Sequence, residues 1–388
     1  MSTLMESTAQ EIALFVFIPF CKIKCTYCDF NAYANMARVM EPYAEAVARE
    51  IRGAAPRLGV KARAKSVYFG GGTPSLVPAA HIEEILRACR DLISLDPNAE
   101  ITLEANPGTV NLDKLRAFRS LGINRLSLGV QSFDDATVRR LNRGHTVRDA
   151  LETYDLARRA GFDNLNLDFI YGLPLQTLAQ WRDTLERALA LAPEHLSLYA
   201  LKVEEGTGLE HQIARGKYPR PDDYLSADMY MLAEELLASS GYDHYEISNW
   251  ARPGLGSRHN LTYWHNEPYL GFGAGAHSFF QRARYWNVMS PVEYIGRIER
   301  GEGVVDGSEE IGRELEMAET MILGLRLGEG VSFEGFENRF GEDGYAKYGE
   351  TLRQVRELGL VELDDRGVRL TPRGRLLSNE VFWRLLPD

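Results

Sequence analysis

Short apolar runs alternate with amphipathic stretches between residues 12 and 201. The first run, Ile12–Ile18, is apolar at every position and predicts a strand that is buried on both faces. Further strands are predicted at 66–69, 100–104, 125–130, 164–169 and 195–201, and helices between them at 42–51, 81–92, 112–121, 147–160 and 178–190. Repeated strand–helix units with short connections indicate the α/β class, with a parallel sheet and helices outside it.

The pattern changes after Gly206. A long helix is predicted at 222–239 and a further strand at 242–245. The segment 249–287 is dense in glycine, aromatic residues and histidine, and we expect it to form an ordered loop.

A different unit is predicted from about residue 306. Three helices are expected, followed by two short strands around Asp364–Gly367, a sequence typical of a hairpin turn. This order is similar to that of a winged helix, but residues 306–388 carry 11 basic and 18 acidic residues, a net charge of −7. Such an acidic unit is poorly suited to DNA, so we interpret it as a docking or lid domain. The predicted organisation is an N-terminal tail at 1–11, a main domain at 12–305 and a C-terminal domain at 306–388.

Composition excludes several classes of protein. The 388 residues are 45% hydrophobic and 26% charged, as in an ordinary globular chain, and the net charge of −11 disfavours a general nucleic-acid binder. The longest strongly apolar run, 12–20, is too short to span a membrane. Residues 1–11 contain no basic residue and do not resemble a secretory signal. We expect a cytoplasmic protein without a transmembrane segment, and leave peripheral membrane contact open.

Three of the four cysteines, Cys21, Cys25 and Cys28, lie within eight residues, whereas Cys89 lies in a predicted helix. A reducing compartment argues against disulfides. Three thiolates in one short loop suit a 4Fe–4S cluster, in which the fourth iron stays open for a substrate or cofactor. A zinc site normally takes four protein ligands. The spacing favours the cluster, while zinc and unreactive thiols remain as alternatives.

Polar groups or glycines follow each predicted parallel strand. In βα barrels, functional groups gather at the carboxyl ends of the strands. Consecutive glycines also let the backbone approach a ligand closely. The groups at the six successive strand ends are the cysteine loop, Gly70–Gly72, Glu104, Gln131, Asp168 and Tyr199.

The cysteine spacing carries a resemblance to a known family. Cys21-Lys-Ile-Lys-Cys25-Thr-Tyr-Cys28 resembles the Cys-x3-Cys-x2-Cys motif of the radical S-adenosylmethionine enzymes. The resemblance implies a partial (β/α)6 TIM-like barrel and a 4Fe–4S cluster on these three cysteines. In that family the open iron binds S-adenosylmethionine, and an electron supplied through the cluster cleaves it. An electron donor is therefore an implied partner.

The resemblance extends over nearly the whole chain. Segments 18–31, 70–75, 104–108, 129–133, 142–145, 168–174 and 271–277 are similar to those of the oxygen-independent coproporphyrinogen III oxidase-like group. Transferred position by position, the implied S-adenosylmethionine contacts are Tyr27, Gly71, Gly72, Thr73, Glu104, Gln131, Arg143 and Asp168.

Two subgroups share these motifs, and two positions distinguish them. The oxidases carry a further cysteine two residues after the third cluster cysteine, where this chain has Phe30. The HemW-type heme chaperones carry His-Asn-x-x-Tyr-Trp, which stands here at His259–Trp264. The resemblance implies that His259 binds heme, with Arg258 as a candidate partner of a propionate. Composition alone favours a different interpretation of His259, that of a hydrogen-bonded loop histidine.

The resemblance therefore implies a heme chaperone that binds a 4Fe–4S cluster, S-adenosylmethionine and heme, and delivers heme to apo-hemoproteins such as respiratory enzymes. An oxygen-independent coproporphyrinogen III oxidase is the alternative, and a zinc-dependent regulator is a third hypothesis. One departure concerns the first strand. The Tyr and His usual before Ile-Pro-Phe-Cys are replaced by Phe15 and Phe17. The loss of a hydroxyl at Phe15 predicts either weaker cofactor binding or a water molecule in place of the contact.

Overall fold

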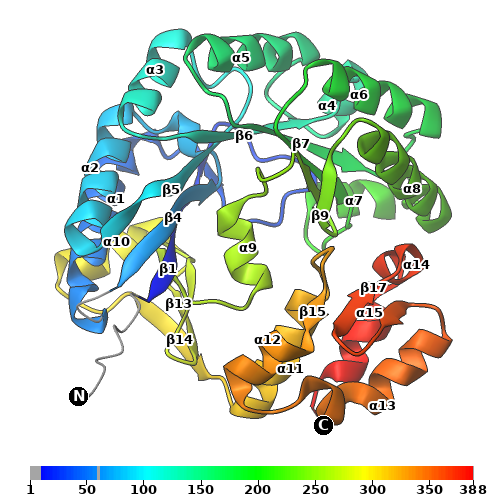
Figure 1. The fold of residues 1–388 in the computed structure, drawn as a ribbon. Helices are drawn as coiled ribbons and strands as arrows, with labels where there is room; N and C mark the ends of the chain where they lie inside the picture. The colour runs from blue at the N-terminus through cyan, green and yellow to red at the C-terminus, as the bar shows by residue number, and fades with distance from the viewer. Residues whose placement is uncertain (1–9, 59–61, 388) are drawn as a thin grey trace, which may run out of the picture.

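The computed structural model describes residues 10–58 and 62–387. Most of the predicted tail at 1–11 lies outside this part of the chain. The centre of the molecule is a twelve-stranded sheet with the order β14-β13-β12-β11-β1-β4-β5-β6-β7-β8-β10-β9. The sheet curves into a partial barrel with helices around its outer face (Figure 1). The predicted α/β barrel class is confirmed.

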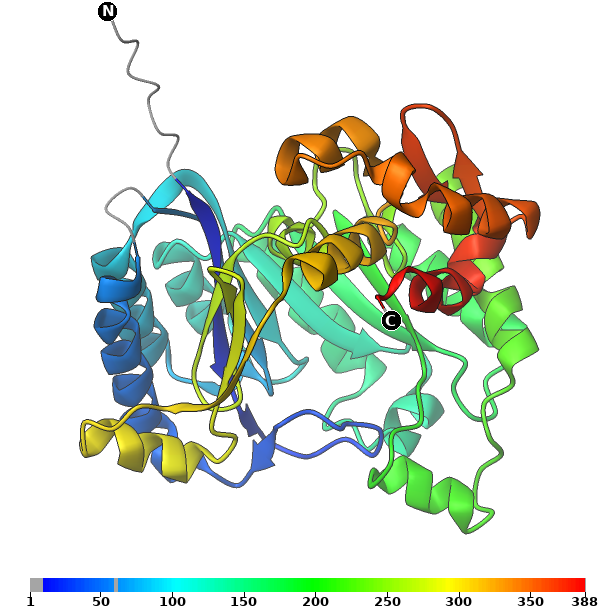
Figure 2. The same cartoon turned by 90° about the horizontal axis from the view of Figure 1, so that it is seen from below.

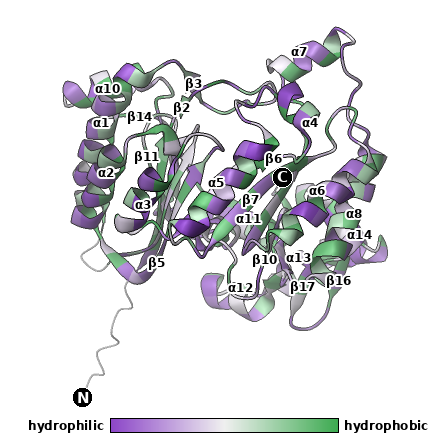
Figure 3. Ribbon diagram, turned by 90° about the horizontal axis from the view of Figure 1, so that it is seen from above, coloured by the Kyte–Doolittle hydropathy of each residue, from purple (hydrophilic) through white to green (hydrophobic). Residues whose placement is uncertain are grey.

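Six adjacent strands of this sheet run parallel, as the apolar runs predict. They are β1 (Glu11–Ile18), β4 (Arg63–Gly71), β5 (Ser94–Ala105), β6 (Arg125–Gln131), β7 (Leu165–Tyr171) and β8 (His195–Ala200). The helices between them are α1 (Met40–Gly53), α2 (Ala79–Leu92), α3 (Leu112–Ser120), α4 (Asp135–Arg140), α5 (Val147–Arg159) and α6 (Leu178–Ala190). These helices carry hydrophobic and hydrophilic residues side by side, because one face of each packs on the sheet (Figure 3).

Local sequence explains where these helices begin. Thr146 caps α5 and Thr177 caps α6, each in a reciprocal capping box with the third residue of its helix. Asn111 caps α3 by accepting from the backbone N–H of Lys114. The predicted and observed helix starts agree closely at these three positions.

The expectation of an ordered loop at 249–287 is wrong. This segment forms β10 (Asn249–Ala251), α9 (Arg258–Trp264), β11 (Tyr269–Phe272), β12 (His277–Phe280) and β13 (Ala283–Asn287). β11 pairs in parallel with β1, and β12 and β13 follow it as an antiparallel extension. The strands are short and most glycines of the segment lie between them, so no clear alternation marks the strands. Gly271 is required because a Cβ there would collide with the carbonyl of His277.

Helix α9 lies within the ring of barrel strands in Figure 1. The remaining elements outside the C-terminal unit are β2 (Phe20–Cys21), β3 (Tyr33–Ala34), α7 (Gly208–Ala214), α8 (Asp223–Ser239), β9 (Asp243–Glu246), α10 (Pro291–Glu299) and β14 (Val305–Glu310). β14 pairs with β13, so the barrel sheet extends past position 305, where the sequence predicts a domain boundary.

The C-terminal unit contains helices and a three-stranded sheet, in the winged-helix-like order that the sequence predicts. Its elements are α11 (Arg313–Gly324), β15 (Val331–Ser332), α12 (Phe333–Phe340), α13 (Gly344–Glu357), β16 (Val361–Leu363), β17 (Gly367–Leu370), α14 (Pro372–Leu376) and α15 (Ser378–Phe382). It has its own hydrophobic core, which includes Met321, Phe336 and Leu352. Figure 2 shows this unit beside the barrel.

Polar contacts join the C-terminal unit to the barrel. The Arg375 guanidinium on α14 lies 2.6 Å from Glu234 of α8, and Arg339 of α12 donates to the carbonyls of His265 and Asn266 beside α9. Within the described residues, no helix is long and apolar enough to cross a membrane.

Replacement of Trp181, on α6, tests the contribution of the barrel core to stability. Its ring is fully buried, and its Nε1–H donates to the carbonyl of Met229 over 2.9 Å. Trp181→Ala should lower the free energy of unfolding by about 3–5 kcal/mol, because it leaves a cavity and an unpaired carbonyl. Chemical denaturation measures this loss. Trp383→Ala is the matched control, since Trp383 is 58% exposed and should change stability by less than about 0.5 kcal/mol. Equal losses in the two variants would contradict this account of the core.

Candidate functional site

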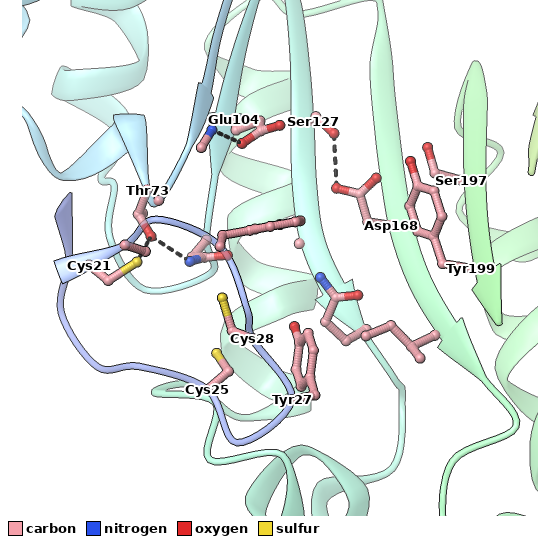
Figure 4. A pocket seen from close by; sticks show the side chains of 18 of the residues that line it. Cys21, Cys25, Tyr27, Cys28, Thr73, Glu104, Ser127, Asp168, Ser197 and Tyr199 are labelled. Atoms are coloured by element: carbon pink, nitrogen blue, oxygen red, sulfur yellow. Dashed lines mark hydrogen bonds between the residues drawn. The ribbon is translucent and has the colours of Figure 1, made fainter. Parts of the chain in front are cut away.

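A cavity of about 390 Å³ opens at the carboxyl ends of the parallel strands. The cysteine loop forms one side of its mouth, and the inward-facing residues of β4 to β8 form its walls (Figure 4). Its lining includes all three clustered cysteines and the predicted contacts Tyr27, Gly71, Gly72, Thr73, Glu104, Gln131, Arg143 and Asp168. The structure thus brings these residues, predicted from segments far apart in the sequence, into one site.

The cysteine loop leaves the first strand and returns at β3. The three thiols are half-buried and free, and Figure 4 shows them on the side of the cavity opposite Asp168 and Tyr199. Cys21 Sγ lies 3.6 Å from Thr73 Oγ1, and Arg143 Nη1 lies 3.5 Å from Cys25 Sγ. The fourth cysteine, on α2, is fully buried and does not line the cavity.

The donor chemistry of this loop fits an iron–sulfur cluster. Burial raises the pKa of Cys21, and it raises the pKa of Cys28 to about 11, so both are thiols at neutral pH until a metal supplies positive charge. In the described part of the chain, no three metal-binding side chains converge on a point where one ion could bind. A cubane takes each thiolate on a different iron, whereas zinc requires four converging ligands. The arrangement therefore does not favour the zinc hypothesis.

The glycine loop after β4 lies against the backbone that precedes the first cysteine. Gly72 N donates to the carbonyl of Ile18 over 2.8 Å, and Thr73 N donates to that of Phe20 over 2.7 Å. A Cβ at Gly72 would lie 2.7 Å from the Phe20 carbonyl oxygen, so no larger residue fits there. Gly71 has φ +112°, a conformation that glycine adopts without strain.

Arg143 connects the cysteine loop to the third and fourth parallel strands. Its Nη1 donates to Tyr27 OH over 3.1 Å, and its Nη2 donates to the carbonyl of Gly129 over 2.7 Å and to the side chain of Asn106. A guanidinium held in this way at the cavity wall can pair with the carboxylate of a ligand. Gln131, at the end of β6, has φ +66°, an unusual conformation that turns this strand end at the cavity.

Two buried carboxylates face the interior. Glu104 accepts from Tyr68 OH over 2.8 Å and from Gly71 N over 3.0 Å, and burial raises its pKa to about 7. Asp168 accepts from Ser127 Oγ over 2.9 Å and from an amide nitrogen of β7, and burial also raises its pKa. Both carboxylates are therefore destabilised when ionised, and a cationic or hydrogen-bond-donating ligand would relieve this.

Sequence reasoning missed several cavity residues. Those on the strands are polar and precede or follow another polar residue of the same strand by two positions, which places both on the inward face. Asn106, which follows β5, and Asn260, which lies on α9, do not belong to this pattern. This spacing within predicted strands was the available signal. The missed residues are Tyr68, Asn106, Arg125, Ser127, Asn166, Ser197 and Asn260.

His259 lies in helix α9, not in a loop, and its ring does not line the cavity. The ring is buried, with Nδ1 2.9 Å from Ser66 Oγ and Nε2 2.9 Å from Tyr263 OH. Burial lowers its pKa to about 3, so the imidazole is neutral. Neutral imidazole is the form that binds iron, but both nitrogens are engaged in this structure. The guanidinium of Arg258 donates to the carbonyl of Asn98 over 2.8 Å.

Phe15 and Phe17, which stand on the first strand where related sequences usually have Tyr and His, lie under the site. The Phe15 ring packs 6.0 Å from that of His259 and 6.1 Å from that of Tyr68. Phe17 lies beneath Gly71, where its ring would be 2.8 Å from an added Cβ. Phe30, at the position of the oxidases' additional cysteine, is 61% exposed at the mouth.

Family models match two parts of the chain. The model of the radical SAM superfamily matches residues 15–188, and that of the HemN C-terminal domain matches residues 313–377. Among solved structures, the coproporphyrinogen III oxidase HemN of Escherichia coli, described as a radical SAM enzyme, aligns with a TM-score of 0.84 at 25% identity. The alignment covers 97% of this chain and 90% of that one.

Curated relatives match over almost the full length. The heme chaperone HemW of Bacillus subtilis is 36% identical over 380 residues, which cover 96% of this chain and 99% of the relative. The mitochondrial radical S-adenosyl methionine domain-containing protein 1 of Mus musculus is 34% identical, covering 99% of this chain and 89% of the relative. Together with the cavity geometry, these matches show that the chain belongs to the HemW family within the radical SAM superfamily.

Proposed function

We propose that this chain binds heme and delivers it to apo-hemoproteins, among them respiratory enzymes, and that it carries a 4Fe–4S cluster and binds S-adenosylmethionine. The observation that carries the proposal is the single cavity lined by the three clustered thiols and by polar residues from five parallel strands. The family relationship supports it, since the relatives include proteins named heme chaperone. We further propose that the barrel, predicted at 12–305 and extended by β14 to Glu310, forms the binding domain, and that the remainder of the predicted unit 306–388 is a docking or lid domain.

The residues of the chain have separate roles in this proposal. Cys21, Cys25 and Cys28 hold the cluster, which supplies electrons from a donor to S-adenosylmethionine when both are bound. The exposed backbone of the glycine loop contacts the methionyl group, and Arg143 pairs with its carboxylate. Glu104 and Asp168 accept hydrogen bonds from the amino and ribose groups. Tyr27, Thr73 and Gln131 complete the contacts.

The first experiment tests the cluster. After anaerobic reconstitution with iron and sulfide, the wild-type chain should hold about four irons and four sulfides, and replacement of any one clustered cysteine by alanine should remove most of both. Cys89→Ala is the matched control and should retain them, because Cys89 lies away from the cavity on α2. A wild-type preparation with one zinc and no iron would overturn the proposal. Formation of protoporphyrinogen from coproporphyrinogen and S-adenosylmethionine would favour the oxidase instead.

The second experiment tests the state of Glu104 through the pH dependence of stability. Burial raises its pKa from 4.5 to about 7, so its contribution to stability is fully present below pH 4.5 and is lost as the pH rises through 7. Glu104→Gln has no such titration. The free energy of unfolding of the wild type, measured without ligand, should therefore fall relative to that of Glu104→Gln between pH 5 and pH 8. A constant difference over this range would show that Glu104 is not held in the high-pKa state.

The third experiment tests His259 as a heme ligand. Iron binding through Nε2 requires the contact with Tyr263 OH to break. Tyr263→Phe should therefore raise heme affinity about fivefold, since one hydrogen bond contributes about 1 kcal/mol, whereas His259→Ala should lose the Soret band of bound heme. His145→Ala controls for loss of a buried histidine elsewhere in the barrel. Unchanged heme stoichiometry in His259→Ala would remove His259 from the proposal.

A further inference from the structure

The cavity extends far below the cysteine loop along β6. Arg125 is the first residue of this strand and Gln131 the last, and both line the cavity. Six residues of parallel strand span about 20 Å. Arg125 therefore marks the end of the cavity away from the cysteine loop.

Arg125 is buried and forms no salt bridge among the described residues. The residue is 2% exposed, and its Nε has no hydrogen-bond partner. None of the ion pairs between described residues involves it, although its charge lowers the pKa of Glu104 and Asp168 against the larger effect of burial. Thr102 of β5 lies opposite Arg125 in the strand pairing, and its hydroxyl is also buried without a hydrogen-bond partner. A buried guanidinium in this state is costly and is stabilised by an anion.

The cavity lining suits a ligand with an apolar body. Tyr68 pairs with Thr102 and so lies level with Arg125, whereas Tyr199 lies near the carboxyl end of β8 and is 42% exposed. The other cationic residues of the lining, Lys24, Arg143 and Lys202, come from the cysteine loop, the segment after α4 and the segment after β8. Among the cationic residues of the lining, Arg125 is thus the one that lies at the start of a barrel strand.

We propose that Arg125 binds a carboxylate of a ligand that has a flat apolar body and enters the cavity from the cysteine side. The inference rests on the proposed function, in which the carboxylate is a propionate of heme. The planar guanidinium can donate two parallel hydrogen bonds to a carboxylate, which a lysine cannot reproduce. Asn260 of α9 is a further polar residue of the cavity lining.

The experiment compares heme with heme dimethyl ester, which keeps the macrocycle and lacks the carboxylates. The reconstituted wild type should bind heme at least tenfold more tightly than the diester. Arg125→Met should abolish this preference by weakening heme alone, since a hydrogen bond to a charged group contributes a factor of about ten or more, and Arg125→Lys should restore part of it. Arg116→Met, the same change on the exposed face of α3, should leave the preference intact.

Two further measurements separate the outcomes. The melting temperature of ligand-free Arg125→Met should stay close to that of the wild type, because removal of a costly buried charge offsets the loss of its attraction to Glu104 and Asp168; a marked fall would show a structural role and overturn the inference. Loss of S-adenosylmethionine binding in Arg125→Met, with the heme preference retained, would assign the carboxylate to that ligand and overturn the heme assignment. If the wild type binds heme and the diester equally, the role of Arg125 is contradicted but the proposed function is not. A wild type that binds neither contradicts the proposed function.

Discussion

The site depends on one close backbone contact. The glycine loop after β4 bonds directly to the carbonyls of Ile18 and Phe20, and Gly72 leaves no space for a side chain between the two segments. This contact fixes where the cysteine loop starts relative to the strand ends. Cys21 consequently lies beside Thr73, and Arg143 reaches Cys25 from the other side. The thiols then face the polar strand ends across one cavity.

A second constraint is the polar interior of the barrel. The faces of β4 to β8 that point outward carry the apolar residues that pack against the helices, as in Leu126 and Leu128 of β6. The inward faces carry charged groups such as Glu104, Arg125 and Asp168, and burial destabilises the two carboxylates in their ionised forms. A ligand that pairs with these groups removes the destabilisation, and the free energy gained contributes to its binding. The apolar outer faces of the strands and the helices packed on them must therefore provide the stability of the fold.

The sequence predicts the parallel half of the fold well, because its apolar runs alternate regularly with amphipathic stretches and threonine or asparagine caps mark the helix starts. It predicts the site through the topology of parallel strands, whose carboxyl ends meet, so Glu104, Gln131 and Asp168 fall together without any contact being known. The segment 249–287 is different. Its strands have three to five residues, and their places are set by pairing with distant β1 and β8, which local sequence does not encode. The hydrogen bonds of His259 depend on the same long-range placement.

The pairing of β11 with β1 has a consequence for synthesis of the chain. β1 is an inner strand, bonded to β4 on one side and to β11 on the other. The second partner ends at Phe272, so it emerges from the ribosome long after Ile18. At about 5–20 residues per second, the interval is on the order of 10–50 s. During that time one edge of an almost wholly apolar strand lacks its partner, and a nascent chain of this fold is exposed to edge-to-edge aggregation that the finished protein avoids.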